Sequence, residues 1–204
     1  MLDNKLKETL LKVSEFYDSR KVGDAGPLGF RRSTDLARLS VCIEQLTMQG
    51  LFTPGEALFL DMGCADGRVN VLFSYLTRES VGIEIDEWTL DEYFPLVNEL
   101  KHDLLKDGLE VPADNISLFH GDSTDKDLYN FIYNRTGINF HDFDIYYTYL
   151  TMQDEFAELI TRKAKKGAIF MVYGLERILP SFDGLRLLTP CTPMEGILAV
   201  YQKE

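Results

Sequence analysis

Cysteine and histidine are both scarce in this sequence. The 204 residues include three cysteines and three histidines. They are spread along the chain, without a CxxC pair and without cysteine and histidine at metal-ligand spacing. A zinc site needs several such ligands close together, and a disulfide framework needs paired cysteines. We therefore expect neither a metal nor disulfide bonds, which fits a reducing compartment.

The sequence also has no long apolar run. Its longest run falls far short of the ~20 residues that a membrane-spanning helix needs. Residues 1–17 carry charges throughout and have no apolar core like that of a signal peptide. We expect a cytoplasmic protein without a membrane partner.

Positive charge is in the minority. There are 21 lysines and arginines against 33 aspartates and glutamates, which gives a formal net charge of −12. A surface of this kind repels phosphate backbones. Nucleic acid is therefore a poor candidate, and a small molecule or a protein is the expected substrate. The sequence leaves the oligomeric state open.

Helices and short apolar strands alternate along most of the chain. Residues 1–53 predict two helices joined by a Gly/Pro-rich loop at 21–30, and we treat them as part of the same domain as residues 54–204. Seven strands are expected after residue 54, at 57–61, 80–84, 116–120, 143–149, 167–174, 185–188 and 196–202. Continuous apolar strands that alternate with helices indicate a parallel sheet covered on both faces.

The fold class predicted from this pattern is α/β, with a Rossmann-like, mostly parallel seven-stranded sheet, helices on both faces and extra N-terminal helices. The last two strands are separated by only a short turn region, which favours an antiparallel last strand. The helical pattern at 87–107 contains Pro95. This predicts either a kinked helix or two helices with Pro95 at the start of the second.

The chemistry is concentrated in residues 59–86. A strand ends at Asp61, and a turn with small residues at Gly63, Ala65 and Gly67 leads into a helix. Small residues let the backbone bend sharply and let a ligand approach it closely. About twenty residues later the next strand ends at Glu84, where a carboxylate can accept both hydroxyls of a ribose. This arrangement predicts a nucleotide site at the carboxyl ends of the strands.

The turn differs from that of a dinucleotide site. A G-x-G-x-x-G motif starting at Gly63 would need a third glycine where Arg68 stands. Asp61 would also repel a pyrophosphate. A carboxylate at this place suits a ligand with an amino group and a sulfonium, which points to S-adenosyl-L-methionine.

Residues 59–86 resemble the first two motifs of the class I (Rossmann-like) S-adenosylmethionine-dependent methyltransferases, and the resemblance extends from about residue 30 onward. Ala65 stands where the family usually has its middle glycine. The resemblance implies that the cofactor is S-adenosyl-L-methionine, with S-adenosyl-L-homocysteine as the product. The cofactor-binding residues that it implies are Asp61, Gly63, Ala65, Gly67, Glu84, Ile85, Asp122, Ser123, Tyr147 and Thr148.

The roles of these residues follow from the family. Glu84 matches the acidic residue on the ribose hydroxyls, and Ile85 would flank the adenine. Asp122 and Ser123 match the third motif, which contacts the adenine amino group. Asp122 has an alternative role as the N-cap of the helix that follows it.

The run DIYYTYLT at 144–151 lies where the family places its fourth motif, beside the transferring methyl group. It lacks the Pro-Pro of enzymes that methylate nucleobase amines or glutamine, and the Pro-Cys of the cytosine C5 enzymes. It more weakly resembles prokaryotic enzymes related to protein-lysine methyltransferases. Tyr149, at the end of the strand, is the candidate catalytic residue.

The predicted function is therefore S-adenosylmethionine-dependent methyl transfer to a small molecule or to a protein side chain such as lysine. The alternatives are a non-catalytic scaffold that binds S-adenosylmethionine and an NAD-dependent oxidoreductase. Two local alternatives also stay open. Arg31 or Arg32 either closes over the ligand's carboxylate or lies in an exposed loop, and Asp66 and Arg68 either form an ion pair or support the turn.

Overall fold

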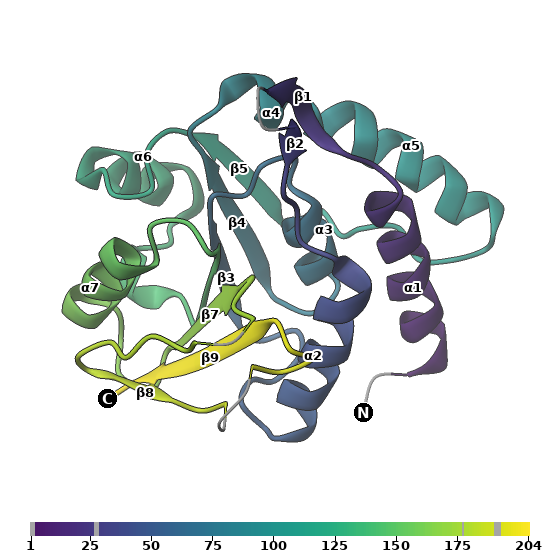
Figure 1. Cartoon of the computed structure of the whole chain (residues 1–204). Coiled ribbons are helices and arrows are strands. Elements are labelled where there is room, and N and C mark those ends of the chain that lie inside the picture. Colours follow the sequence, from purple (N-terminus) through teal and green to yellow (C-terminus); the bar gives the residue numbers. More distant parts are fainter. Residues whose placement is uncertain (1–2, 27–28, 177, 190–192) are drawn as a thin grey trace.

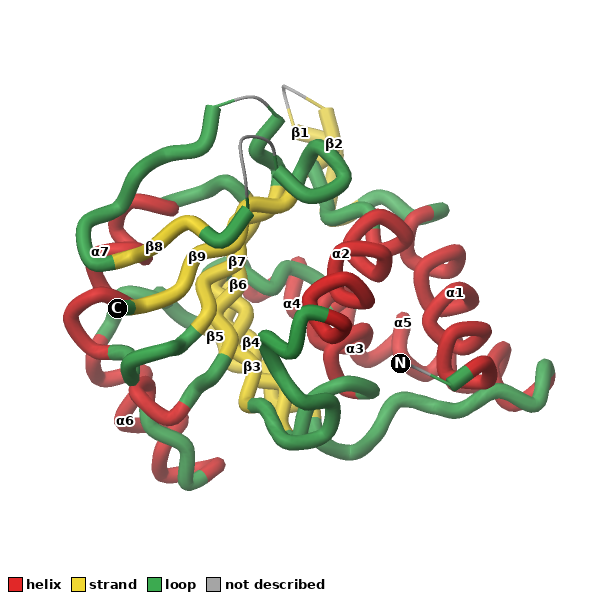
Figure 2. The backbone as a smooth tube through the Cα atoms, turned by 90° about the horizontal axis from the view of Figure 1, so that it is seen from below, coloured by secondary structure: helices red, strands yellow, loops and turns green. Residues whose placement is uncertain are grey.

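The computed structural model describes residues 3–26, 29–176, 178–189 and 193–204. It consists of a central sheet between two layers of helices, as Figure 2 shows in a view from below. One face of the sheet is covered by α1, α2, α3 and α5, and the other by α6 and α7 (Figure 1). The helices are α1 (Asn4–Asp18), α2 (Leu36–Met48), α3 (Arg68–Ser74), α4 (Glu87–Asp91), α5 (Tyr93–Lys106), α6 (Lys126–Thr136) and α7 (Gln153–Lys163), with a 3₁₀ turn η1 (Phe140–Asp142).

The main sheet has seven strands in the order β5-β4-β3-β6-β7-β9-β8. The pairs from β5 to β7 are parallel, whereas β9 is antiparallel to both β7 and β8. The predicted fold class is confirmed, including the reversed last strand. The strands are β3 (Leu58–Met62), β4 (Glu79–Glu84), β5 (Ile116–His120), β6 (Ile145–Tyr149), β7 (Ile169–Tyr173), β8 (Leu185–Leu187) and β9 (Leu198–Lys203).

The chain turns in opposite directions from the middle of this sheet. From β3 it proceeds to β4 and β5 on one side, and β6 and β7 lie on the other side of β3. In open α/β sheets ligands bind outside the carboxyl ends of the strands at such a switch point. The topology therefore directs attention to the loops that follow β3, β4 and β6.

Successive side chains of each strand point to opposite faces of the sheet, so they belong to two separate hydrophobic cores, one on each face. Phe59 and Tyr147 face α1, α2, α3 and α5, and the Phe59 ring stacks on Phe73 of α3 with 3.8 Å between centroids. Tyr146 and Phe170 face α6 and α7. Because the side chains of β6 alternate, its tyrosines are divided between the two faces.

The segment at 21–30 differs from the expected loop. It contains an antiparallel hairpin of β1 (Val22–Gly26) and β2 (Gly29–Arg31), in which Val22 pairs with Arg31. Glycine and proline predicted a loop here, and they gave no sign of the short antiparallel pairing between β1 and β2. For residues 24–26 and 29–31 the structure describes the backbone only. Contacts with α4 place β1 beside the loop that follows β4 (Figure 1).

The helical pattern at 87–107 follows one of its two predicted forms. It divides into α4 and α5, with Pro95 in the first turn of α5. A proline in the first turn costs no intrahelical hydrogen bond, because the amide hydrogens there have no partner within the helix. Across the described part of the chain, no helix combines the length and apolar character needed to cross a membrane.

Candidate active site

A cavity of about 490 Å³ lies at the carboxyl ends of β3, β4 and β6. This volume falls within the range of ~300–1,000 Å³ that is typical of small-molecule sites. Most of the site residues predicted from the sequence line it: Gly63, Ala65, Glu84, Ile85, Asp122, Ser123, Thr148 and Tyr149. Asp61, Gly67 and Tyr147 are not among its lining residues. The sequence motifs therefore converge on one place, although not every predicted residue faces it.

The turn after β3 is held by backbone hydrogen bonds. The amides of Gly63 and Cys64 both donate to the carbonyl of Ile83, each at 2.9 Å. Gly63 has a φ of +115°, and no described atom lies within 4 Å of the place where its Cβ would be. The backbone at Gly63 thus borders open space in the cavity, as close approach of a ligand requires.

Gly67 is needed for a different reason. It is the N-cap of α3 with a φ of +75°, a left-handed conformation that side chains disfavour. A Cβ at Gly67 would lie 2.8 Å from Leu118 Cδ1 and from Tyr93 Cδ2. The glycine therefore allows the turn to pack against β5 and α5.

Glu84 is fixed by the turn that it faces. Its Oε2 accepts a hydrogen bond from the amide of Ala65 and its Oε1 accepts one from the amide of Asp86, both at 2.9 Å. The side chain lines the cavity although only 5% of the residue is exposed. Each carboxylate oxygen can accept more than one hydrogen bond. The carboxylate is therefore held in one orientation and is suited to accept further hydrogen bonds from a ligand.

Asp61 lies beneath this turn, on the face of the sheet that carries Tyr147. It is 1% exposed, and its Oδ1 has no hydrogen-bond partner among the described residues. Burial, together with the nearby carboxylates of Glu84 and Asp66, raises the pKa of Asp61 well above its ordinary value. Such a carboxylate would be stabilised by a cationic group placed nearby.

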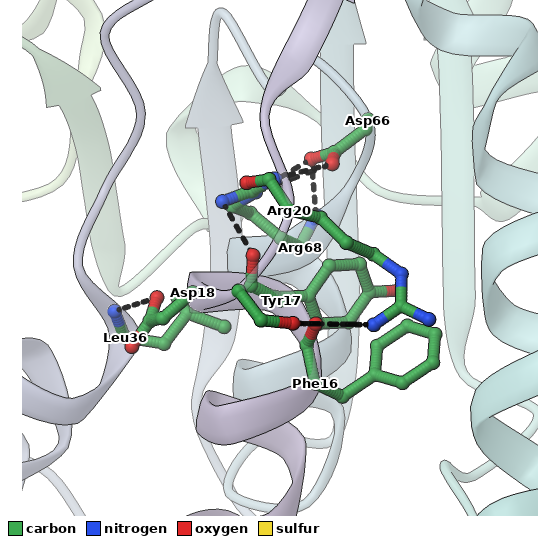
Figure 3. A network of polar contacts seen from close by, with 8 residues as sticks. Phe16, Tyr17, Asp18, Arg20, Leu36, Asp66 and Arg68 are labelled. Atoms are coloured by element: carbon green, nitrogen blue, oxygen red, sulfur yellow. Dashed lines mark hydrogen bonds and ion pairs between the residues drawn. The ribbon is translucent and has the colours of Figure 1, made fainter.

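Asp66 and Arg68 form a buried ion pair, and the Arg68 amide also donates to Asp66 Oδ1 within the turn, so both roles considered for these two residues are present. The Arg68 Nη2 lies 2.9 Å from Asp66 Oδ2, and both side chains are almost fully buried. Arg68 Nη1 also donates to the carbonyl of Tyr17 at 3.2 Å (Figure 3). The pair therefore joins the glycine-containing turn to the C-terminal end of α1.

Cys64, in the same turn, does not have the properties of a nucleophile. It is buried, and burial raises the pKa of its thiol well above the ordinary value. A nucleophilic cysteine needs an accessible thiolate. Among the described residues there is also no group of three or more His, Cys, Asp or Glu side chains able to hold a metal ion.

Asp122 and Ser123 follow β5 and line the cavity from the adjacent side. Asp122 Oδ1 accepts hydrogen bonds from both the amide and the hydroxyl of Thr124, at 2.8 Å each. The N-cap of α6 is Asp125, not Asp122. The alternative role of Asp122 as a helix cap is therefore wrong, and its carboxylate stabilises the turn beside the cavity instead.

The end of β6 contributes Thr148 and Tyr149 to the cavity. The Thr148 hydroxyl donates to the carbonyl of Met62 at 3.2 Å, which connects β6 to β3. Tyr149 is half-buried. Tyr147 points away from the cavity into the N-terminal layer, where its hydroxyl lies 2.7 Å from Thr34 Oγ1. The structure thus gives Tyr147 a contact other than the predicted one with a cofactor.

Several lining residues were not predicted from the sequence. They are Met62, Ile83, Leu150, Thr151, Met152 and Phe156. Met62 and Ile83 read as ordinary strand residues, and Leu150, Thr151 and Met152 were considered only as the place of the fourth motif, not as site residues. Their position directly after a strand was the one available signal. Of the two arginines considered for a lid, Arg32 lines the cavity, and the side chain of Arg31 lies outside what the structure describes.

No family model matches the chain, and no curated protein matches it in sequence. Solved structures do match it in three dimensions. A mutant of MtNAS aligns with a TM-score of 0.57 and 14% identity over 97% of this chain and 70% of that one. The yhhF protein of Escherichia coli aligns with a TM-score of 0.53 and 16% identity over 87% and 90%.

A third similar structure is that of Aeropyrum pernix fibrillarin with natively bound S-adenosyl-L-methionine. It aligns with a TM-score of 0.52 and 15% identity over 82% of this chain and 74% of that one. At these identities the similarity concerns the fold. The fold is that of the class I, Rossmann-like S-adenosylmethionine-dependent methyltransferases, as the sequence motifs predicted.

Proposed function

We propose that this protein is an S-adenosylmethionine-dependent methyltransferase that acts on a small molecule or on a protein side chain. One observation carries the proposal. The Gly63 turn, the fixed carboxylate of Glu84 and the Asp122 loop, which lie far apart in sequence, all line one cavity at the switch point of the sheet. This is where a nucleoside ligand binds in an open α/β sheet.

The residues present fit the cofactor. Glu84 would accept the ribose hydroxyls, Ile85 would flank the adenine, and Asp122 with Ser123 would contact the adenine amino group. The unpartnered buried oxygen of Asp61 suits a ligand that carries positive charge. When bound, S-adenosyl-L-methionine supplies both the methyl group and its thioether leaving group. The protein then needs to bind, align the acceptor and exclude water.

The acceptor end of the cavity is apolar and aromatic. Tyr149, Leu150, Met152 and Phe156 line it, and the carboxylates among the described lining residues are Glu84 and Asp122, which we assign to the nucleoside. In this proposal Tyr149 orients the acceptor by its hydroxyl, and its ring stabilises positive charge by a cation–π contact. A protein-lysine acceptor and a small-molecule acceptor are both compatible with such a lining.

The cavity also bears on the alternatives. A scaffold without activity would fill the space beside Tyr149 with side chains, and the open volume there favours an active enzyme. An NAD-dependent oxidoreductase would need a pyrophosphate at the turn. Two buried carboxylates, Asp61 and Glu84, lie at this turn, and Arg68 is already paired with Asp66, which disfavours a pyrophosphate there.

Calorimetric titration tests the proposal. Purified protein is titrated with S-adenosyl-L-methionine, S-adenosyl-L-homocysteine and NADH, and the titrations are repeated on Asp61→Ala and Glu84→Ala. Micromolar binding of the two sulfur compounds, lost in both variants and kept in the exposed control Glu158→Ala, is expected. Absence of this binding in the wild type, or preference for NADH, would contradict the proposal.

A further inference from the structure

Two tyrosine hydroxyls from the sheet hold the segment that precedes α2. The Tyr147 hydroxyl of β6 lies 2.7 Å from Thr34 Oγ1. The amide of Asp35 donates to the Tyr173 hydroxyl of β7 at 3.1 Å, and that hydroxyl donates to the carbonyl of Asp35 at 3.3 Å. Strands β6 and β7 therefore each form hydrogen bonds to one of two consecutive residues, Thr34 and Asp35, near the carboxyl end of the sheet.

The hydrogen bond between Tyr147 and Thr34 lies in the protein interior, whereas the two between Tyr173 and the exposed Asp35 are partly buried. Tyr147 and Tyr173 are each 1% exposed, and Thr34 is 5% exposed. A buried hydroxyl that loses its protein partner cannot turn to water, so hydrogen bonds of this kind hold their geometry firmly. Burial also raises the pKa of Tyr147 well above its ordinary value, which keeps its hydroxyl protonated.

The other end of this segment is also fixed. The Asp18 carboxylate of α1 accepts hydrogen bonds from the amides of Leu36 at 2.8 Å and Ala37 at 3.0 Å, and Figure 3 shows the bond to Leu36. The first turn of α2 is therefore attached to α1, while Thr34 and Asp35 are attached to the sheet. Little freedom remains for the backbone at Thr34.

Arg32 lies two residues before Thr34 and lines the cavity. Two residues of extended chain span at most about 7 Å. Because Thr34 is fixed, the Cα atom of Arg32 can lie only within this distance of it. Arg32 is also the one basic side chain among the described residues that line the cavity, so it is the natural partner there for an anionic group.

We propose that Tyr147 and Tyr173 are positioning residues that, through Thr34 and Asp35, hold Arg32 where it pairs with the carboxylate of a bound amino-acid group. The inference rests on the proposed function, because it concerns the methionine end of that ligand. In this proposal the tyrosine hydrogen bonds help the cavity to select ligands by their amino-acid group. A ligand with the carboxylate gains the contact with Arg32, and a ligand without the carboxylate does not.

The test compares S-adenosyl-L-homocysteine with 5′-methylthioadenosine, which keeps the adenosine and the thioether but lacks the amino-acid group. The variant is the double substitution Thr34→Val with Tyr147→Phe. It removes both hydroxyls of one hydrogen bond and leaves no buried polar group unpaired, so the melting temperature is expected to stay close to that of the wild type.

By calorimetry the double variant is expected to bind S-adenosyl-L-homocysteine about tenfold more weakly and 5′-methylthioadenosine within about twofold of the wild type, because only the first compound has the carboxylate whose hydrogen bond to Arg32 is weakened when Arg32 is displaced. Arg32→Ala is expected to give the same pattern with an equal or larger loss.

Tyr146→Phe is the matched control. Tyr146 is the neighbouring residue of the same strand and is equally buried, but its hydroxyl donates to the Phe140 carbonyl on the opposite face. This variant loses a buried tyrosine hydrogen bond without touching the segment at 32–35. Its affinities for the two compounds are expected to keep the ratio found in the wild type.

Two results would overturn the inference while leaving the proposed function intact. In one, the double variant binds both compounds as tightly as the wild type does. In the other, it loses affinity for both compounds equally, which would assign Tyr147 to the cavity as a whole. A wild-type protein that binds neither compound would instead contradict the proposed function and, with it, the inference.

Discussion

The charged side chains around the turn at 61–68 are buried, and they differ in how fully they are paired. Arg68 is matched by Asp66 and by the carbonyl of Tyr17. Asp61 has one oxygen without a partner among the described residues. A buried pair contributes little net stability, but removing one member leaves an uncompensated charge. Removal of one member of the Asp66–Arg68 pair is therefore expected to destabilise the folded protein.

Substitution of Arg68 is expected to be severe. Arg68→Met should lower the free energy of unfolding by about 3–5 kcal/mol, because it leaves the Asp66 carboxylate buried without its cation. Urea denaturation followed by circular dichroism measures the change. Arg162→Met is the control, since Arg162 forms an exposed pair with Glu158 at 3.6 Å, and it should change the value by less than about 1 kcal/mol. Equal effects of the two substitutions would contradict this assignment.

Asp61 is expected to make stability depend on pH in a defined direction. Its pKa in the folded protein is raised above the ordinary 3.8, so the folded state retains the proton longer than the unfolded state. Its contribution is therefore greatest below pH 4 and is lost as the pH rises through the folded pKa. Relative to Asp61→Asn, the wild type should become progressively less stable in urea denaturation as the pH rises above 4.

Asp107→Asn is the control, because the pKa of Asp107 is shifted in the opposite direction from that of Asp61. A hydrogen bond from Lys12, 2.7 Å away, lowers the pKa of Asp107. The wild type should therefore gain stability relative to Asp107→Asn as the pH rises above the folded pKa of Asp107. Parallel pH profiles for wild type and Asp61→Asn would show that Asp61 is not held in the environment described here.

At the scale of elements, sequence patterns predicted the strands well because buried parallel strands are short continuous apolar runs. The turn from Asp61 to Gly67 was predicted because its small residues and flanking carboxylate are local features. The hairpin of β1 and β2 was missed, since its pairing involves few residues with strong strand preference. The contact between Tyr147 and Thr34 joins segments far apart in sequence, and no local pattern encodes it.

Substitution of Gly67 tests how closely the turn after β3 packs against β5 and α5. Gly67→Ala combines a left-handed backbone with a Cβ at 2.8 Å from Leu118 and Tyr93 side-chain atoms. Gly108 has a similar φ of +71° and no described atom within 4 Å of its Cβ position. Gly108→Ala should cost about 1–2 kcal/mol from backbone strain, and Gly67→Ala about 1–3 kcal/mol more from crowding. Thermal and urea denaturation compare them; equal costs would contradict the described packing.

At the scale of the whole molecule, the N-terminal helices share a core with the sheet. Side chains of α1 and α2, such as Tyr17 and Ile43, lie in the same buried cluster as Phe59 and Tyr147. The apolar pattern of residues 1–53 predicted the helices themselves. It did not predict which face of the sheet they cover, because that depends on long-range packing.

Removal of these helices is expected to abolish cooperative folding. A chain of residues 54–204 would expose the face of β3, β6 and β7 that α1 and α2 cover. A large exposed apolar face favours aggregation or a loosely packed state. The truncated chain should lack near-ultraviolet circular dichroism and a sharp thermal transition. A cooperative transition like that of the full chain would show that residues 54–204 fold independently.

The crystal structure of the protein with S-adenosyl-L-homocysteine tests the central claim most directly. The account predicts the ligand in the cavity at the ends of β3, β4 and β6, with its ribose hydroxyls hydrogen-bonded to Glu84 and its carboxylate beside Arg32. A ligand bound elsewhere on the molecule, or a ribose in this cavity that faces away from Glu84, would contradict it.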